Sequence, residues 1–481
     1  MKLQNFVAIT HFVLASCCAN VALAQKLPAS PAPATLRVDY LHTGDAKAES
    51  YAIERVVIEP LPWPGNLQKN IDTSNRGVNL FEVRDAATNE LLYSRGFSTI
   101  FAEWQSTEEA TKQRRGFQES LRFPDFGKPV KVSVLKRESQ DKFVEVWHTV
   151  VDAKAQDVVK KQVDARLKPV PIHVSGPSSE KVDLLVLGDG YTQQQMGKFV
   201  ADAKRLAKHL FTVSPFKERA KDFNVWALAV PTPEAGVSRP STGHYKASTL
   251  GTRYDIFASE RYVLTLDNRA LREISQYAPY EFIEILVNNE TYGGGGIFGQ
   301  FSTAAASNDW ANYLFVHEFG HHFAGLADEY YTSPVAYATG GTERQEPWEP
   351  NVTALKNPAQ VKWQQHVKAG TPMPTPWPKE EYEKGSRAYQ AIRAELRKNN
   401  RPESEMSALF KKDLAQSSAL FDKSEHRHTI GAFEGANYEA TGFYRSEMQC
   451  IMFDRSEKFC QVCQDGISTI IDLYSASSAK K

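Results

Sequence analysis

The sequence predicts an α+β protein in which an N-terminal β-sandwich, residues 25–151, precedes an α/β domain, residues 172–481. Three observations predict this organisation: strand-like alternation in the first part, strand and helix periods that follow one another in the second, and a change of composition between them. The 481 residues exceed the usual size of one domain, and 42% hydrophobic residues are enough to build two cores.

The predicted β-sandwich depends on short stretches in which apolar and polar residues alternate, such as 130–134 and 143–147. Turn residues separate these stretches, for example at 62–66. A period of two turns one face of each strand toward a core, as in a sandwich of two sheets. Residues 152–171 are charged, permit a helix and end among prolines, so we expect a linker there.

The predicted α/β domain opens with an apolar strand at 182–187 that leads into a helix. Thr192 and Gln195 have the spacing of a capping box at the start of that helix. Further apolar stretches at 225–230 and 282–287 predict two more strands. The order strand, helix, strand is typical of parallel sheets.

Two regions of this domain have a different character. The glycines at 293–296 predict a flexible turn, after which 297–303 can form an edge strand. Residues from about 332 to 429 are polar and rich in proline, with helical patterns at 379–398 and 403–420. We interpret this long stretch as an insertion that covers one side of a cleft.

The first 24 residues have the pattern of a signal peptide, with Lys2, an apolar stretch and the cleavage pattern Ala22-Leu23-Ala24. A second interpretation makes Cys17 the lipid-bearing residue of a lipobox. No later segment approaches ~18 uninterrupted apolar residues, so we expect no transmembrane span once the signal is removed. The protein is therefore expected to be exported, whether to the periplasm, the medium or the outer surface.

The charge of the chain is balanced, with 57 Lys and Arg residues and 57 Asp and Glu residues. This balance lacks the positive excess that binding to nucleic acid or anionic lipid requires, so we expect no nucleic-acid partner. The oligomeric state stays open.

Three cysteines, Cys450, Cys460 and Cys463, remain near the C-terminus after removal of the signal. In an oxidising compartment we favour a disulfide between two of them, with the third left as a thiol. The alternative is a second zinc site, which needs a fourth ligand.

The segment that carries chemistry is His317-Glu318-Phe319-Gly320-His321, inside a buried-helix pattern. On a helix, His317 and His321 lie one turn apart on the same face and can share one tetrahedral Zn²⁺. Glu318 is rotated away from the metal but can reach a water molecule there as the catalytic general base. The competing interpretation is that both histidines are ordinary core and surface residues.

A catalytic zinc needs a third protein ligand and one open position. Gly325 lies where the chain must turn back, and Asp328 follows it at a spacing that suits a third ligand. Glu329 and a more distant residue are the alternatives.

Two downstream residues are candidates for the same site. Met452 can lie below the metal, as in the Met-turn of metzincins, or can simply fill the core. Residues 431–438 and 441–445 interleave small and aromatic residues, as a substrate wall requires. Tyr444 is a catalytic candidate for stabilising the oxyanion, with surface packing as its alternative.

The segment 317–330, together with 185–191, 292–295 and 349–353, resembles the IgA-peptidase-type family of secreted bacterial zinc metallopeptidases, which are close to the metzincins. The likeness extends from about 36 to 467. It implies a zincin-like fold with one catalytic Zn²⁺, held by His317, His321 and Asp328 with Glu318 as the base. It does not transfer a substrate.

Together these features predict an exported zinc-dependent endopeptidase that hydrolyses peptide bonds in proteins or peptides. One alternative is a zinc hydrolase of another amide or of a cell-wall peptide. The other is a surface protein that binds glycan or protein and has an idle metal site. The intact Glu318 favours the enzymes, because an idle site needs no base.

Overall fold

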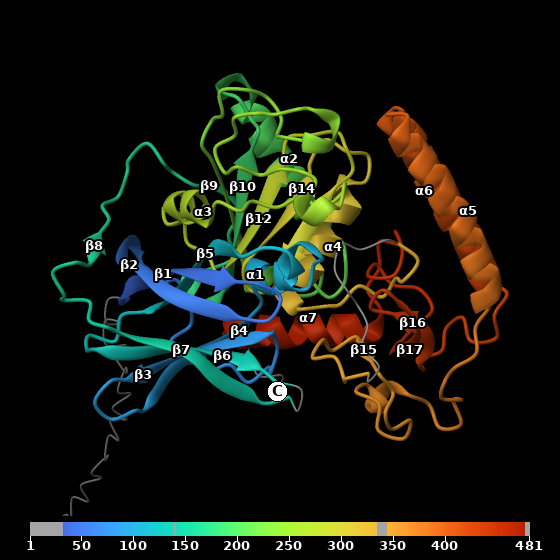
Figure 1. Ribbon diagram of the computed structural model, residues 1–481, viewed down its shortest axis with the longest axis horizontal. Helices are drawn as coiled ribbons and strands as arrows, with labels where there is room; N and C mark the ends of the chain where they lie inside the picture. Colours follow the sequence, from blue (N-terminus) through green and yellow to red (C-terminus); the bar gives the residue numbers. More distant parts are fainter. Residues whose placement is uncertain (1–31, 139–140, 334–343, 477–481) are drawn as a thin grey trace, which may run out of the picture. The chain divides into compact units, whose positions relative to one another are not determined.

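The computed structural model describes residues 32–138, 141–333 and 344–476 (Figure 1). The predicted signal peptide at 1–24, with the alternative lipidation residue Cys17, lies outside the described residues. None of the helices in the described ranges is long and apolar enough to cross a membrane.

The N-terminal part consists of two four-stranded sheets, with strand orders β5-β1-β2-β8 and β4-β3-β6-β7. Side chains from both sheets share one core, in which Val38, Val83 and Phe123 are completely buried. This is the sandwich that the alternating pattern predicts. The strands are β1 (Ala34–Gly44), β2 (Glu49–Pro62), β3 (Asn79–Asp85), β4 (Leu91–Phe97), β5 (Arg115–Pro124), β6 (Val130–Arg137), β7 (Phe143–Val151) and β8 (Val159–Lys160).

The second part is built on a six-stranded sheet with the order β13-β14-β12-β10-β11-β9. The four inner strands are parallel, and the two edge strands run antiparallel to their neighbours. The predicted strand, helix, strand order is therefore present. The strands are β9 (Val170–His173), β10 (Val182–Asp189), β11 (Phe223–Ala229), β12 (Phe282–Val287), β13 (Gly294–Ile297) and β14 (Phe301–Ala305).

Helices cover both faces of this sheet. Alternate residues of β10 enter two different cores: Val186 packs with α2, α4 and α7, whereas Leu187 packs on the side of α3. Burial on both faces explains why β10 reads as a continuous apolar run. The predicted capping box of Thr192 and Gln195 is present just before α2. The helices are α2 (Met196–Leu210), α3 (Asn268–Ser275), α4 (Ala311–Ala324) and α7 (Gln461–Tyr474).

The stretch interpreted as an insertion contains the two predicted helices, α5 (Lys379–Lys398) and α6 (Glu403–Phe421), which lie side by side (Figure 1). A small sheet with the order β15-β17-β16 joins the beginning of this stretch to the chain that follows it. Its strands are β15 (Val352–Thr353), β16 (Phe433–Ala436) and β17 (Glu439–Arg445).

Residues 152–171, where we expect a linker, contain no helix; β8 lies within them and pairs with β2, and β9 begins at their end and pairs with β11. One prediction about connections is wrong. The edge strand is β13, which begins within the glycine run, and not 297–303. The glycines serve a close approach: a Cβ on Gly294 would lie 2.9 Å from the Glu318 Cγ atom of α4, and one on Gly296 would lie 2.4 Å from the Glu318 backbone oxygen.

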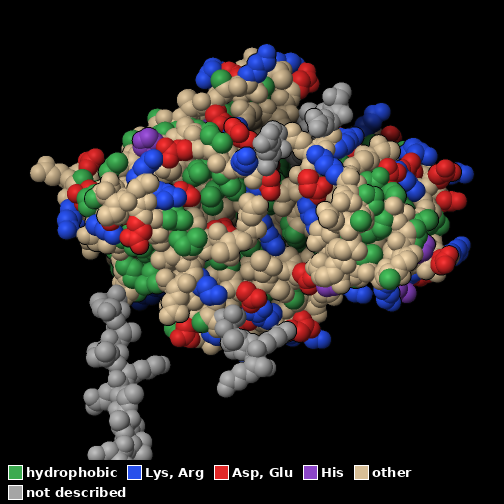
Figure 2. Space-filling view, turned by 90° about the horizontal axis from the view of Figure 1, so that it is seen from below, with side chains coloured by type: hydrophobic (Ala, Val, Ile, Leu, Met, Phe, Trp, Pro, Cys, Tyr) green, Lys and Arg blue, Asp and Glu red, His purple; other side chains and the backbone are tan. Residues whose placement is uncertain are grey.

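The surface carries both charges in mixture. On the face shown in Figure 2, basic and acidic side chains are interspersed, in agreement with the equal counts in the sequence. No single-sign patch dominates that face.

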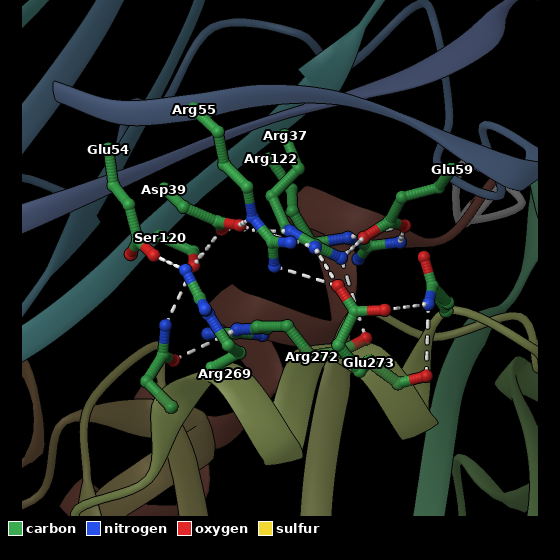
Figure 3. A network of polar contacts seen from close by, with 12 residues as sticks. Arg37, Asp39, Glu54, Arg55, Glu59, Ser120, Arg122, Arg269, Arg272 and Glu273 are labelled. Atoms are coloured by element: carbon green, nitrogen blue, oxygen red, sulfur yellow. Dashed lines mark hydrogen bonds and ion pairs between the residues drawn. The ribbon is translucent and has the colours of Figure 1, made fainter. Parts of the chain in front are cut away.

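The sandwich and the second part belong to one compact unit, Pro33–Lys481. A buried polar network joins β1, β2 and β5 to α3 (Figure 3). Its centre is Arg37, whose guanidinium lies 2.9 Å from Glu59 and 3.2 Å from Glu273 of α3. Arg55 of β2 also bonds Glu273, at 2.7 Å. Because removing one partner would leave a buried charge unpaired, this network fixes how the sandwich meets α3.

A second contact reaches the helix that carries the HExxH segment. Arg76, which follows β2, donates hydrogen bonds to the backbone oxygens of Ala324, at 2.6 Å, and Gly466, at 2.9 Å. Ala324 is the last residue of α4, whose final carbonyls have no partner within the helix. The sandwich therefore supplies a positively charged cap to α4.

Candidate active site

Helix α4 holds the HExxH segment in a buried position between the sheet and α7. Its residue Gly320 permits close packing beneath the histidines, because a Cβ there would lie 3.2 Å from the Met452 Sδ atom. Met452 is completely buried. It thus lies against the turn of α4 that carries the histidines. This position fits both interpretations of Met452, as a Met-turn residue and as a core residue.

His317 and His321 converge with Asp328, as predicted from their spacing. The two Nε2 atoms are 3.2 Å apart, and the Asp328 Oδ1 atom lies 3.2 Å from the first and 3.3 Å from the second. These three atoms form a nearly equilateral triangle that could hold one metal ion. Asp328 Oδ1 is buried and has no hydrogen-bond donor among the described residues.

Backbone carbonyls orient both imidazoles. The Nδ1 atom of His317 lies 2.9 Å from the Ile451 oxygen, and that of His321 lies 2.6 Å from the Leu326 oxygen. A carbonyl only accepts, so each Nδ1 carries the proton and donates it. Each Nε2 is then the atom that faces the other two corners of the triangle, and on losing its proton it can bind a metal, which is the arrangement found at metal-binding histidines.

The turn after α4 explains why Asp328 reaches the histidines. Gly325 adopts a left-handed conformation with φ 59°, and the amides of Gly325 and Leu326 bond the oxygens of His321 and Gly320. The bond from Gly325 to His321 is that of the αL motif at a helix end, for which glycine is the favoured residue. The chain then runs back past the site, with Asp328 facing the histidines and Glu329 facing away.

Asn351 fixes this returning segment. Its side chain bonds both the amide and the oxygen of Ala327, each at 2.9 Å, and also Glu329 Oε1 at 3.0 Å. Spacing alone does not reveal this residue, but it lies in the 349–353 segment on which the family resemblance partly depends.

The electrostatics of the triangle favour a positive charge at its centre. Although burial acts in the opposite direction, the imidazoles of His321 and His317 hold the pKa of Asp328 well below its usual value. Burial likewise opposes the effect of Asp328 on His321, yet that carboxylate raises the pKa of His321 to about 9. Burial raises the pKa of the neighbouring Glu318 carboxyl, and the two imidazoles partly offset this increase.

A cavity of about 360 Å³ opens onto the triangle. Glu318 lines it beside the two histidines, and Gly294 and Gly296 of β13 form part of its wall. The cavity therefore brings a buried carboxylate, the ligand triangle and a sheet edge together.

The sandwich supplies another wall of this cavity, through Thr99, Ala102 and Glu103. Glu103 lies on the short helix α1 (Ile100–Gln105) and accepts a hydrogen bond from the Tyr262 hydroxyl. Burial raises the pKa of Glu103 to about 7. Nothing in the sequence pattern connects this helix with residues more than 200 positions away, so only the packing of the two parts reveals its place.

Three tyrosines line the cavity, Tyr262, Tyr330 and Tyr438, and Tyr444 is not one of them. Tyr438 lies in the tight turn between β16 and β17, where Asn437 and Tyr438 both have positive φ, 52° and 64°. Its hydroxyl donates to Asp328 Oδ2. Tyr444 is not among the cavity-lining residues; burial and the carboxylate of Glu434 raise the pKa of its hydroxyl. The signal that would have found Tyr438 is its Asn-Tyr turn within the predicted wall 431–438.

The three cysteines do not form the expected disulfide. All are buried free thiols, and the Sγ atoms of Cys450 and Cys463 are 3.8 Å apart, compared with about 2.05 Å for a disulfide bond. Glu329, the alternative third ligand of the histidine site, lies beside these thiols instead.

Two histidines and two carboxylates line one open cavity, and comparison with known families identifies the class of protein as a peptidase. A family model described as IgA Peptidase M64 matches residues 170–471, and one described as Peptidase M64 N-terminus matches residues 30–148. The chain belongs to the M64 peptidase family, as its resemblance predicts. A search of the curated proteins finds no match.

Proposed function

We propose that this protein is an exported, zinc-dependent endopeptidase with a zincin-like catalytic part. The observation that carries the proposal is the triangle of His317 Nε2, His321 Nε2 and Asp328 Oδ1 beside Glu318. A tetrahedral zinc with bonds of about 2.0–2.1 Å separates its nitrogen and oxygen ligands by about 3.3 Å. The measured separations, 3.2, 3.2 and 3.3 Å, fit that ion.

When bound, a zinc ion would act as a Lewis acid toward the scissile carbonyl and toward water. His317, His321 and Asp328 would hold the ion, and three protein ligands would leave a position for these oxygens. The chain's own contribution is to hold the two imidazoles in place through the carbonyls of Ile451 and Leu326, at the floor of a cavity that a substrate could enter.

Glu318 would move the proton. Its carboxylate takes a proton from the attacking water molecule while the water oxygen bonds to the carbonyl carbon of the substrate. The same carboxyl then gives that proton to the nitrogen of the leaving amine as the C–N bond breaks. Burial beside Gly294, where no side chain could fit, keeps this carboxylate at the cavity.

The edge strand β13 would bind an extended substrate by strand addition. The outward-facing groups of Gly294 are already used, since its amide donates to the Arg261 oxygen and its carbonyl accepts from the Val263 amide, both at 3.1 Å. In an antiparallel ladder every second residue faces outward, so the next outward-facing residue is Gly296, in the cavity wall. We propose that the substrate backbone pairs there.

We assign stabilisation of the oxyanion to Tyr438 in place of Tyr444. A hydroxyl that bonds a metal ligand is close to the carbonyl that the metal would polarise, and donors aimed at the developing charge are a major source of catalysis. The turn between β16 and β17 holds this hydroxyl toward the cavity. Because the hydroxyl has a single proton, it would exchange its hydrogen bond to Asp328 for one to the oxyanion.

The deciding experiment compares two carboxylates of the same cavity. Purified Glu318→Gln is expected to retain its metal and to digest an unfolded protein about 100- to 10,000-fold more slowly, the range that a general base contributes. Glu349→Gln, which changes another cavity-lining carboxylate outside the proposed machinery, is the control and should keep most of its activity.

Chelator should abolish digestion, and added Zn²⁺ should restore it. Undiminished proteolysis by Glu318→Gln would refute the proposed base. Cleavage of a cell-wall peptide or another amide, with unfolded protein left intact, would favour the alternative hydrolase.

Export is proposed from the Ala22-Leu23-Ala24 pattern. The mature protein should begin at Gln25, which N-terminal sequencing of the exported form would show. A mature N-terminus at a lipid-modified Cys17 would instead show that the protein is anchored to a membrane by this lipid.

A further inference from the structure

A second cluster of metal-binding side chains lies beside the proposed catalytic site. Cys450, Cys460, Cys463 and Glu329 bring their ligand atoms within 4.8 Å of one another. All four residues are buried, with exposed fractions of 2% or less. They come from three segments of the chain. Glu329 lies in the segment after α4, Cys450 lies after β17, and Cys460 and Cys463 lie at the start of α7.

The spacing of these atoms matches a tetrahedral ion. Zinc–sulfur bonds of about 2.3 Å separate two sulfur ligands by about 3.8 Å, and a sulfur and a carboxylate oxygen by about 3.6 Å. The Sγ atoms of Cys450 and Cys463 are 3.8 Å apart. Glu329 Oε1 lies 3.4 Å from Cys463 Sγ and 3.8 Å from Cys460 Sγ.

The backbone around the cysteines is arranged to support thiolates. Cys450 Sγ accepts the amide of Cys460 at 3.2 Å, and Cys460 Sγ accepts the amide of Cys463 at 3.4 Å. Cys460 is also the N-cap of α7, where the helix dipole favours negative charge. The Ser446 hydroxyl adds a further donor to Cys460 Sγ, at 3.4 Å.

The burial of Glu329 beside the cysteines is not explained if the three cysteines are simply free thiols. Its side chain is completely buried, yet its Oε2 atom has no hydrogen-bond donor among the described residues. A buried carboxylate with an oxygen that lacks a donor is costly, and a cation bound through Oε1 would offset its negative charge. The carboxylate also supplies the fourth ligand that three cysteines lack.

We propose that Cys450, Cys460, Cys463 and Glu329 bind a second zinc ion, which has a structural role. All four positions would be filled by protein side chains, so no position stays open for water or substrate. The thiol protons are released to solvent on binding, and no oxidant or reductant is involved.

This ion would stabilise the two segments that position the ligands of the proposed catalytic metal. Glu329 directly follows Asp328, and its amide donates to the Met452 oxygen at 2.8 Å. Cys450 precedes Ile451, whose oxygen orients His317. Binding Glu329 and Cys450 to one ion would therefore fix the two segments that position the third ligand and one imidazole.

Metal content tests the proposal in the purified mature protein. We expect two zinc ions per chain in the wild type and in Glu318→Gln, one in His321→Ala and one in Cys463→Ser. Two ions in the wild type with one left in His321→Ala supports the second site, whereas loss of all zinc in His321→Ala overturns it. Because proteolysis is not measured, this result is separate from the outcome of the Glu318 experiment.

The wild type alone provides a test that does not depend on the folding of a variant. Cobalt(II) substitution should produce a near-ultraviolet thiolate-to-cobalt charge-transfer band, which the sulfur-free histidine site cannot give. Alkylation followed by peptide mapping should find Cys450, Cys460 and Cys463 unmodified until a chelator removes the metal. A disulfide-linked peptide among these cysteines, or the absence of the charge-transfer band, overturns the proposal.

Discussion

Two clusters of metal-binding side chains lie on either side of one dipeptide, and they differ in how they meet solvent. Asp328 faces His317 and His321 at the floor of a cavity, whereas Glu329 faces three cysteines that are closed off by protein. The first cluster has three side chains that could hold a metal ion, and room for an incoming molecule. The second has four and no access. A metal site can catalyse only when one coordination position stays free for water or substrate. A site whose positions are all filled by protein ligands can only stabilise the fold.

The dipeptide has this double role because of its conformation. The side chain of Asp328 lies with the histidines and that of Glu329 lies with the cysteines, so the two neighbours serve different clusters. Asn351 fixes the segment that carries them by bonding Ala327 and Glu329. Substitutions at the two neighbouring carboxylates should therefore have different consequences.

The largest effect is expected from Asp328→Asn. Loss of the charged ligand should release the metal of the open cluster and lower kcat/KM by roughly 1,000-fold or more, since a catalytic metal contributes several kcal/mol to transition-state stabilisation. Metal analysis should still find the ion of the closed cluster. Normal activity with one metal missing would reverse the roles assigned to the two clusters.

Tyr438→Phe should come next, with kcat lowered about 100-fold, the loss typical of one oxyanion donor. KM should change little, because the hydroxyl acts on charge that develops in the transition state. Tyr444→Phe is the matched control, and its kcat should stay close to that of the wild type. A larger loss for Tyr444→Phe than for Tyr438→Phe would restore the prediction made from sequence.

Glu329→Gln should have a smaller effect on catalysis, about tenfold, which is the lower range for groups that orient metal ligands. The variant should retain the metal of the open cluster and lose that of the closed one, and its Tm should fall. Steady-state kinetics, metal analysis and thermal unfolding together measure this. Complete loss of activity with both metals retained would contradict the structural role of the second ion.

The smallest effect is expected from Asp413, a partly buried carboxylate that belongs to neither cluster. Burial raises the pKa of Asp413 from 3.8 to about 6. Between these values the folded state keeps a proton that the unfolded state has lost, so stability should fall as the pH rises through this window. In the wild type the free energy of unfolding should fall by an amount on the order of 1 kcal/mol, after allowance for partial exposure. Asp413→Asn should not show this fall.

Urea unfolding at several pH values would measure the difference between wild type and Asp413→Asn. Activity and both metal counts should be unchanged, which makes this variant the baseline for the other three. A difference that grows as the pH falls below 3.8 would show that the sign of the pKa shift is wrong.

Local patterns in the sequence predicted much of the fold. The strand at β12 and the helices α2, α5 and α6 follow from periodicity and capping, because these features depend on residues a few positions apart. The edge strand was misplaced for the opposite reason. Glycines at 293–296 permit many conformations, and the close approach of α4 selects the extended one.

The sequence by itself determined the one-turn spacing of His317 and His321, the place of Glu318 between them and the turn at Gly325, since a helix and its cap are local structures. Only the tertiary structure decided that Asp328 and not Glu329 joins the histidines, that Tyr438 and not Tyr444 reaches the cavity, and that the sandwich forms one of its walls. Those choices depend on the packing of segments that are distant in the chain. Local spacing therefore cannot fix them.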